Sequence, residues 1–360
     1  MKVALDTNAL FVTRAGVARY LNGIRAGFAR LGPAAPDVTE LAWPVPSFAY
    51  GQPLRAIKTA YRELLWPRWV AGPALRRLQP DILHITSAIP YPQPDGVRCV
   101  ATLYDLAVLR QPERFRRWHA TSTRRRLQRL RTMDRIICIS RFTADEAMSL
   151  LSLPASRLDV VPLGCDGPSD EPARGEQPGP AFEPPQRFFL FVGSLEPGKN
   201  LALLHRVYAQ AQNSGVSLPP LAIVGARWAG VPAEARPPDA WGWVYAGRQP
   251  DAVLNRLYRS AVALVFPSRY EGFGLPPLEA MREGCPVICS PVASLPEVVG
   301  DAACLVDSSP AAYLDALRRM DCEDSLRREL SERGRRRAAG FTWLACAEGT
   351  LDVYRKALGL

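Results

Sequence analysis

The chain has 360 residues, of which 48 % are hydrophobic and 22 % are charged, and this length allows two globular domains with full cores. No apolar run reaches the roughly 18 residues that a membrane-spanning helix needs, so the sequence predicts no such helix. The net charge of +10 favours an anionic membrane face or a phosphate-bearing substrate, whereas the absence of any nucleic-acid-binding motif argues against a nucleic acid as partner.

The first residues predict the start of a doubly wound α/β domain. Residues 1–12 lack the apolar core and small-residue cleavage site of a signal peptide, so we expect a first strand over 2–6 and a cytoplasmic protein. A turn over 13–16 leads into a helix with apolar residues at helical spacing. Gly16 is then a candidate contact for a phosphate at the helix N-terminus, although a plain tight turn explains this glycine equally well.

Two segments combine basic and apolar residues in a way that suits a membrane surface. Residues 33–75 are rich in proline and aromatic residues with arginine and lysine between them, and they could form an interfacial surface that recognises an acceptor. An ordinary connection packed on the sheet is an equal interpretation. Residues 114–135 form the most basic stretch, which could lie against anionic lipid head groups or could be a solvated helix face.

Strands are predicted next at two places in the first half. Residues 81–86 form a strand that places His84 near the end of the sheet, where ligands bind in open α/β folds. Residues 97–103 form the following strand, and Tyr104 and Asp105 come directly after it.

The second half restarts the same pattern after a linker. Residues 167–186 are rich in proline, glycine and acidic residues without apolar periodicity, which predicts an interdomain linker. A strand over 188–192 leads through the loop 193–200 into a helix. Lys199 stands in this loop at the helix N-terminus, beside the turn at Gly193. A lysine in that place could neutralise a diphosphate without a metal ion.

A further phosphate-binding loop is predicted around Glu271. Residues 261–267 form an apolar strand, the loop 268–275 contains two glycines, and a short helix opened by two prolines ends at Gly284. The backbone N–H groups of the loop and the positive end of the helix dipole favour a diphosphate. Glu271 in the loop and Glu279 in the helix could accept hydrogen bonds from sugar hydroxyls.

This motif carries a specific resemblance. The stretch FPSRYEGFGLPPLEAMREGCPVICS, followed by SLPEVVGDAACLVD, resembles the nucleotide-sugar site of the retaining glycosyltransferases of family 4, and VGSLEPGKN resembles their second phosphate loop. The resemblance implies the α/β GT-B fold, in which two doubly wound Rossmann-like domains face each other across a cleft. It implies an acceptor domain over 1–166, a nucleotide-sugar domain over 187–342, and a helix over 343–360 that crosses back onto the first domain.

The resemblance also implies roles for single residues. Glu271, Lys199, Asp105 and Tyr104 are the expected catalytic residues, although Tyr104 stands where many relatives have a histidine. Glu279 is expected to hold the ribose and Glu271 the hydroxyls of the sugar. The other residues expected to contact the donor are Gly16, Gly193, Arg248, Gly272, Phe273, Gly274 and Leu275.

No cofactor and no metal ion are expected. The loops hold no DxD-type carboxylate pair, and the eight cysteines form no CxxC pair and no Cys/His cluster with metal-ligand spacing. The cysteines are instead predicted to be small buried residues in a reducing compartment.

The predicted reaction is transfer of a hexosyl group from a nucleoside diphosphate sugar to an acceptor hydroxyl, with retention at the anomeric carbon. The motifs favour GDP-mannose as donor and a lipid-linked or polysaccharide acceptor, with peripheral contact at the anionic inner face of the cell membrane. Two alternatives stay open. Tyr104 and Gly198, in place of a family histidine and a frequent family arginine, also suit a protein that binds nucleotide sugar without transfer. A phosphorylase or epimerase of the same fold is the other alternative.

Overall fold

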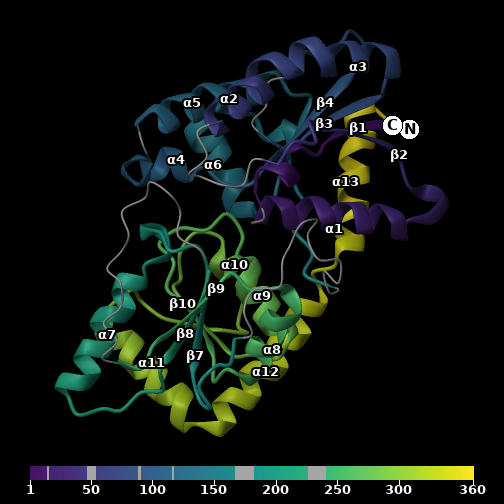
Figure 1. The fold of residues 1–360 in the computed structure, drawn as a ribbon. Coiled ribbons are helices and arrows are strands. Elements are labelled where there is room, and N and C mark those ends of the chain that lie inside the picture. The colour runs from purple at the N-terminus through teal and green to yellow at the C-terminus, as the bar shows by residue number, and fades with distance from the viewer. Residues whose placement is uncertain (14–15, 47–53, 88–90, 116, 167–181, 226–240) are drawn as a thin grey trace. The chain divides into compact units, whose positions relative to one another are not determined.

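The computed structural model describes residues 1–360 except 14–15, 47–53, 88–90, 116, 167–181 and 226–240 (Figure 1). The described chain forms two compact units, one of residues 1–164 with 342–360 and one of residues 165–341. Most of the linker predicted over 167–186 lies outside the described residues.

The first unit is built on a six-stranded parallel sheet with the order β2-β1-β3-β4-β5-β6. The direction of the order changes between β1 and β3, which is the place where open α/β sheets bind ligands. The inner strands of the sheet are almost entirely buried and carry mainly apolar side chains, as expected where both faces of a parallel sheet are covered. The strands are β1 (Lys2–Asp6), β2 (Asp37–Leu41), β3 (Ile82–Ile85), β4 (Arg98–Leu103), β5 (Arg135–Cys138) and β6 (Leu158–Val160).

The last helix of the chain packs on the first one, as Figure 1 shows for the yellow helix α13 beside α1. Gly23 and Gly27 allow this close approach, since a Cβ at Gly23 would lie 2.1 Å from the ring of Trp343. The helices of the first unit are η1 (Asn8–Phe11), α1 (Gly16–Arg30), η2 (Gly32–Ala34), α2 (Arg55–Ala60), η3 (Tyr61–Leu65), η4 (Pro67–Ala71), α3 (Gly72–Leu78), α4 (Ala107–Arg110), η5 (Pro112–Arg114), α5 (Arg117–Leu127), η6 (Gln128–Thr132), α6 (Arg141–Leu151), η7 (Ala155–Arg157) and α13 (Trp343–Leu358).

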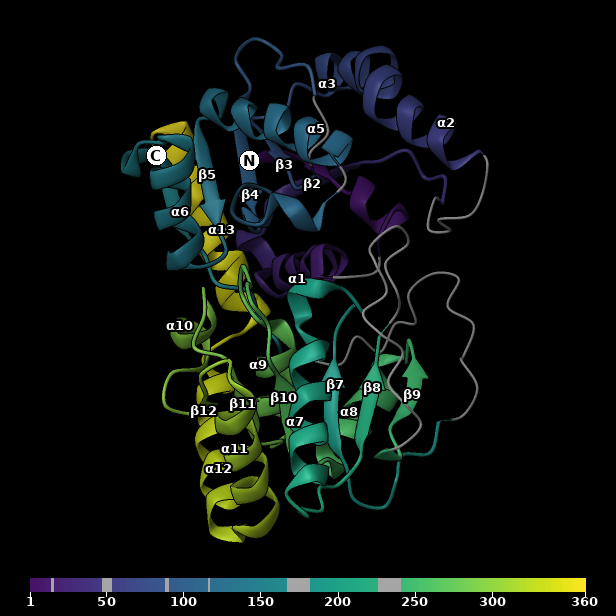
Figure 2. The ribbon, with the colours of Figure 1, turned by 90° about the vertical axis from the view of Figure 1, so that its left-hand side faces the viewer.

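The second unit has its own six-stranded parallel sheet with the order β12-β11-β10-β7-β8-β9. Figure 2 shows α7 and α11 together on one face of this sheet, and their buried side chains form one core with it. The strands are β7 (Phe189–Val192), β8 (Leu221–Val224), β9 (Val244–Gly247), β10 (Leu264–Phe266), β11 (Val287–Cys289) and β12 (Cys304–Leu305). The helices are η8 (Pro197–Lys199), α7 (Leu201–Asn213), α8 (Asp251–Ser260), α9 (Leu275–Arg282), α10 (Leu295–Val299), α11 (Pro310–Cys322) and α12 (Asp324–Ala339).

The predicted α/β class with two doubly wound domains is confirmed by these two parallel sheets. The structure adds elements within residues 33–75 that the sequence pattern does not predict. This segment contains the edge strand β2 and the helical run from α2 to α3. The prolines and aromatic residues of the segment obscure the helical spacing, and the winding of η3 and η4 as π-helix shifts that spacing further.

Candidate active site

Two loops at the carboxyl end of the second sheet form the candidate active site. The loop 193–200 follows β7 and the loop 267–274 follows β10, and these two parallel strands are neighbours in the sheet. The Arg269 backbone N–H donates to the Gly198 carbonyl over 2.8 Å, and the Arg269 guanidinium donates to the Asn200 side chain over 3.0 Å. These bonds hold the two loops together and place a cation that the sequence analysis did not single out.

Lys199 and Glu271, the two leading candidates, meet between these loops. Lys199 Nζ donates to Glu271 Oε1 over 2.5 Å, and the two side chains are only 19 % and 12 % exposed. The aliphatic part of Lys199 packs on Gly193, where an added Cβ would lie 3.5 Å from it. Because an ammonium group has three hydrogens and Glu271 takes one, the others can be directed at an anionic ligand.

Helix α9 begins directly after a strained turn. Gly274 has a φ of 112°, and a Cβ there would lie 2.7 Å from Leu295, so glycine is required on both grounds. Pro276 and Pro277 have no N–H, and the N–H donors at this helix end therefore come from the turn residues Phe273 and Gly274 and from Leu275. The arrangement suits an anion at the positive end of the helix.

Ser294 fixes the shape of this turn, and the sequence analysis missed it. The side chain is fully buried, and its Oγ lies 2.9 Å from the carbonyl oxygens of both Glu271 and Phe273. Ser294 stands directly before α10 but makes no side-chain capping bond to that helix. A serine before a Leu-Pro helix start was the available signal, but it points to a helix cap and not to a loop clamp.

Glu279 lies one turn along α9 and is 7 % exposed. Its Oε2 accepts a hydrogen bond from the Tyr258 hydroxyl over 3.3 Å. Arg248 follows β9, so it lies at the same carboxyl edge of the sheet as the two loops. The second unit thus brings together the predicted donor contacts Gly193, Lys199, Glu271, Gly272, Phe273, Gly274, Leu275 and Glu279.

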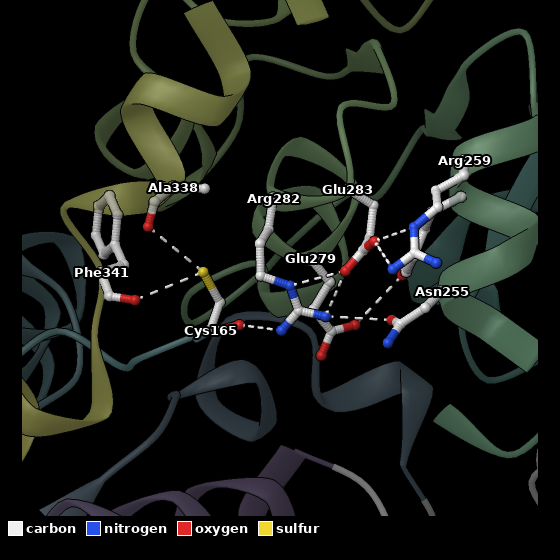
Figure 3. Close-up of polar contacts among 9 residues, drawn as sticks. Cys165, Asn255, Arg259, Glu279, Arg282, Glu283, Ala338 and Phe341 are labelled. Carbon is white, nitrogen blue, oxygen red and sulfur yellow. Dashed lines mark hydrogen bonds and ion pairs between the residues drawn. The ribbon is translucent and has the colours of Figure 1, made fainter. Parts of the chain in front are cut away.

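Arg282 at the end of α9 ties this helix to its surroundings (Figure 3). Its guanidinium donates to the Cys165 carbonyl, to the Asn255 side chain over 3.2 Å and to Glu283 over 3.0 Å. Cys165 is the first residue of the second unit, and its N–H donates to the carbonyl of Phe341, the last one, over 2.9 Å. Arg282 therefore links the donor helix to the point where the chain enters and leaves this unit.

Three predicted site residues lie in the first unit. The Tyr104 hydroxyl is buried without a hydrogen-bond partner among the described residues, and burial raises the pKa of Tyr104 well above its ordinary value. The phenol therefore stays protonated and can donate. Asp105 Oδ1 accepts from the Ala107 N–H over 2.9 Å at the start of α4. Gly16 begins α1, and an added Cβ there would meet nothing within 4 Å, so no steric reason in the described structure requires glycine.

His84 has a structural place instead of the ligand contact expected from its position in the strand. Its ring nitrogens lie 2.7 Å from the Tyr354 hydroxyl and 2.7 Å from Thr102 Oγ1, and the side chain is fully buried. The imidazole thus joins β3 and β4 to α13. Burial lowers the pKa of His84 from 6.5 to about 3.

This low pKa predicts acid sensitivity of the first unit. The unfolded chain protonates His84 below pH 6.5, while the folded state keeps this side chain neutral down to about pH 3. His84 therefore has no effect on the pH dependence of stability above pH 6.5, and between pH 6.5 and pH 3 it lowers the free energy of unfolding by up to about 1.4 kcal/mol for each pH unit. Thermal melting of wild type and His84→Gln between pH 7.5 and 4 measures the difference. Equal acid-induced losses in both proteins would contradict the assignment.

Comparison with known proteins decides the family. Residues 15–167 match the family described as Glycosyltransferase Family 4, and residues 176–337 match Glycosyl transferases group 1. The O-antigen chain mannosyltransferase B of Escherichia coli is 33 % identical over 328 residues, which cover 86 % of this chain and 82 % of that protein. The chain belongs to the family 4 glycosyltransferases.

Further similar proteins include a second mannosyltransferase and a solved structure of the same fold. A serotype-specific mannosyltransferase of Escherichia coli is 27 % identical, over 79 % of this chain and 38 % of its own length. Sucrose-phosphate synthase from Thermosynechococcus elongatus superposes with a TM-score of 0.76 at 19 % identity, over 99 % of each chain. The structural match confirms the GT-B fold, and the family confirms the prediction of a hexosyltransferase.

Proposed function

We propose that this glycosyltransferase moves a mannosyl group from GDP-mannose to a lipid-linked or polysaccharide acceptor, with retention at the anomeric carbon and without a metal ion. The observation that carries the proposal is the Lys199–Glu271 pair beside the N-terminal end of α9. The mannosyltransferases among the relatives support the choice of sugar. We further propose that the enzyme works in the cytoplasm at the inner membrane face. Among the described residues, no helix is long and apolar enough to cross a bilayer.

The leaving group of this reaction is a nucleoside diphosphate whose negative charge grows in the transition state. Lys199 pairs with Glu271 in the loop before α9, and Ser294 binds the Glu271 carbonyl in the same loop. The backbone N–H groups of the turn that ends at Gly274 and the positive end of the α9 dipole follow in the chain and would add to the charge of Lys199. Preorganised donors of this kind stabilise developing charge strongly because they need no reorganisation during the reaction. In this proposal, these donors neutralise the diphosphate in place of a metal ion.

The two glutamates have separate tasks in this proposal. Glu279 accepts from the ribose hydroxyls, while the Tyr258 hydroxyl holds one of its carboxylate oxygens in place. Glu271 binds hydroxyls of the transferred sugar and, through Lys199, stays close to the diphosphate. Asp105 and Tyr104 act from the first unit on the sugar or the acceptor, where Tyr104 donates as a neutral phenol. The acceptor hydroxyl attacks from the face that the leaving group occupies.

Thermal-shift measurements with UDP-, GDP- and dTDP-sugars in EDTA test this proposal. GDP-mannose is expected to raise the melting temperature of wild type, and Glu279→Ala and Lys199→Ala are expected to abolish the shift. A shift with a different nucleotide sugar would identify that compound, and not GDP-mannose, as the donor. If no nucleotide sugar causes a shift, the protein has lost donor binding. Absorbance of bound pyridoxal phosphate would identify a phosphorylase instead.

A further inference from the structure

The helical run from α2 to η4 exposes several large apolar side chains. Six of the eleven large hydrophobic side chains that are exposed among the described residues lie between residues 54 and 70, and Trp69 is 70 % exposed. A group of this kind on a protein surface normally marks a site of interaction with a partner. We call this surface the apolar face, and its residues are Leu54, Ile57, Leu64, Leu65, Trp69 and Val70.

The same segment is positively charged. Residues 54–70 contain four basic residues and one acidic residue, Glu63, which forms an ion pair with Arg126 of the basic helix α5. Tryptophan and leucine beside lysine and arginine are the composition of helices that lie in the interface of an anionic bilayer. The charge complementarity therefore favours an anionic membrane over another protein as the partner of the apolar face.

A cavity of about 1140 Å³ adjoins the apolar face within the first unit. Leu64 and Leu65 belong to both, so the cavity continues directly from the exposed surface. Further walls are apolar, including Leu127, Leu130 and Met133. The charged residues along its lining are four arginines and two carboxylates, namely Arg62, Arg68, Arg126, Arg129, Glu63 and Asp105. The volume slightly exceeds the range of about 300–1,000 Å³ that is usual for small-molecule sites, so a long chain has room.

Arg62 gives this cavity a chemical preference. Its side chain is 2 % exposed and lines the cavity, and its Nη2 donates to the backbone carbonyls of Val45 and Trp43. No described residue accepts a hydrogen bond from its Nε. A buried cation with an unused donor is costly unless an anionic group reaches it. The cavity therefore combines apolar walls with a buried cation that can bind a negatively charged group.

We propose that the apolar face docks on an anionic bilayer and that the adjoining cavity takes a membrane lipid in which a phosphate is joined to a long apolar chain. The phosphate meets Arg62, and the chain lies along the leucines that connect the cavity to the membrane. This inference rests on the proposed function, because such a lipid would carry the lipid-linked acceptor. It narrows the acceptor to an amphiphile that is taken from the membrane surface.

Sedimentation with lipid vesicles tests the docking surface. Wild type is expected to bind phosphatidylcholine vesicles that contain phosphatidylglycerol and to bind pure phosphatidylcholine weakly. Trp69→Ser and Ile57→Ser should each reduce binding to the anionic vesicles about tenfold or more. The matched controls are Tyr245→Ser and Met148→Ser, which remove exposed apolar side chains elsewhere and should bind like wild type. Equal binding of all five proteins, or no vesicle binding by wild type, would overturn the docking surface.

Titration with farnesyl phosphate below its micelle concentration tests the cavity. Farnesyl phosphate is expected to bind, whereas farnesol and inorganic phosphate should each bind at least about tenfold more weakly because they lack the head group or the chain. Arg62→Met should lose this preference, and Leu130→Trp, which fills the cavity, provides a second test if Arg62→Met is unstable. Ile57→Ser should retain binding, since Ile57 does not line the cavity. Equal binding of farnesyl phosphate to wild type and both cavity variants would overturn the assignment.

Donor binding separates this inference from the proposed function. Trp69→Ser and Leu130→Trp should keep the thermal shift of wild type with GDP-mannose. If wild type binds GDP-mannose but neither vesicles nor farnesyl phosphate, only the lipid site is overturned. If wild type binds vesicles and farnesyl phosphate but no nucleotide sugar, the lipid site is supported and the proposed transfer reaction is contradicted.

Discussion

Replacement of Lys199 by methionine is expected to lower the turnover number by about 10²–10³-fold, which is the usual effect of removing one preorganised donor to a developing anion. The loss has two sources. The variant has no ammonium group for the departing diphosphate, and the Glu271 carboxylate, which accepts from Lys199 over 2.5 Å, is left beside that diphosphate without its partner. Initial rates of nucleotide release from the preferred donor at saturating concentration measure the effect.

A second lysine provides the matched control for this experiment. Lys356 pairs with Asp159 over 2.8 Å in the first unit and is 54 % exposed. Lys356→Met removes the same chemical group from an ion pair whose two partners both belong to the first unit, and it should keep the wild-type turnover number. A Lys199→Met enzyme with wild-type turnover would show that the helix end and the backbone donors suffice without this lysine.

Replacement of Arg282 by alanine is expected to destabilise the second unit by about 2–3 kcal/mol, because hydrogen bonds from a charged donor are worth about 1.5–3 kcal/mol and two acceptors lose their partner. These acceptors are the Cys165 carbonyl and the Asn255 side chain, which lie on either side of the guanidinium in Figure 3. The melting temperature should fall by roughly 4–12 °C. Donor affinity should fall as well, since α9 carries Glu279 and starts at the phosphate turn.

The control for Arg282 is an arginine in an exposed ion pair. Arg333 pairs with Glu329 over 2.6 Å at 41 % and 53 % exposure, and Arg333→Ala should change the free energy of unfolding by no more than about 0.5 kcal/mol. If Arg282→Ala were as stable as Arg333→Ala, the contact between Arg282 and Cys165 would not contribute to the free energy of unfolding.

The strands and the two phosphate loops could be predicted from the sequence because each depends on residues that follow one another within a short segment. Apolar runs define β7 and β10, and the glycines and prolines after β10 define the turn and the start of α9. The partners within the site are separated by long stretches of chain. Lys199 and Glu271 are 72 residues apart, and Arg282 and Cys165 are 117 residues apart. No local pattern predicts which of these side chains meet.

The sequence also did not show which polar and aromatic side chains are buried. His84 has the expected place in β3, yet only the packing of α13 shows that its ring contacts Tyr354 and not a ligand. Residues 33–75 suggested either a membrane surface or an ordinary connection, and the composition alone did not decide. The exposed Trp69 and the buried Arg62 lie on the same helical run, and only the fold shows which of the two side chains is covered.

Proton NMR of GDP-mannose during incubation with the enzyme in EDTA tests the proposed reaction most directly. Without an acceptor, water takes the place of the acceptor hydroxyl, and the first sugar product shows the stereochemistry before its anomers equilibrate. We expect release of GDP together with α-mannose, because GDP-mannose carries an α-linked sugar and the proposed attack retains this configuration. Formation of β-mannose first, or no release of GDP in EDTA, would contradict the proposal.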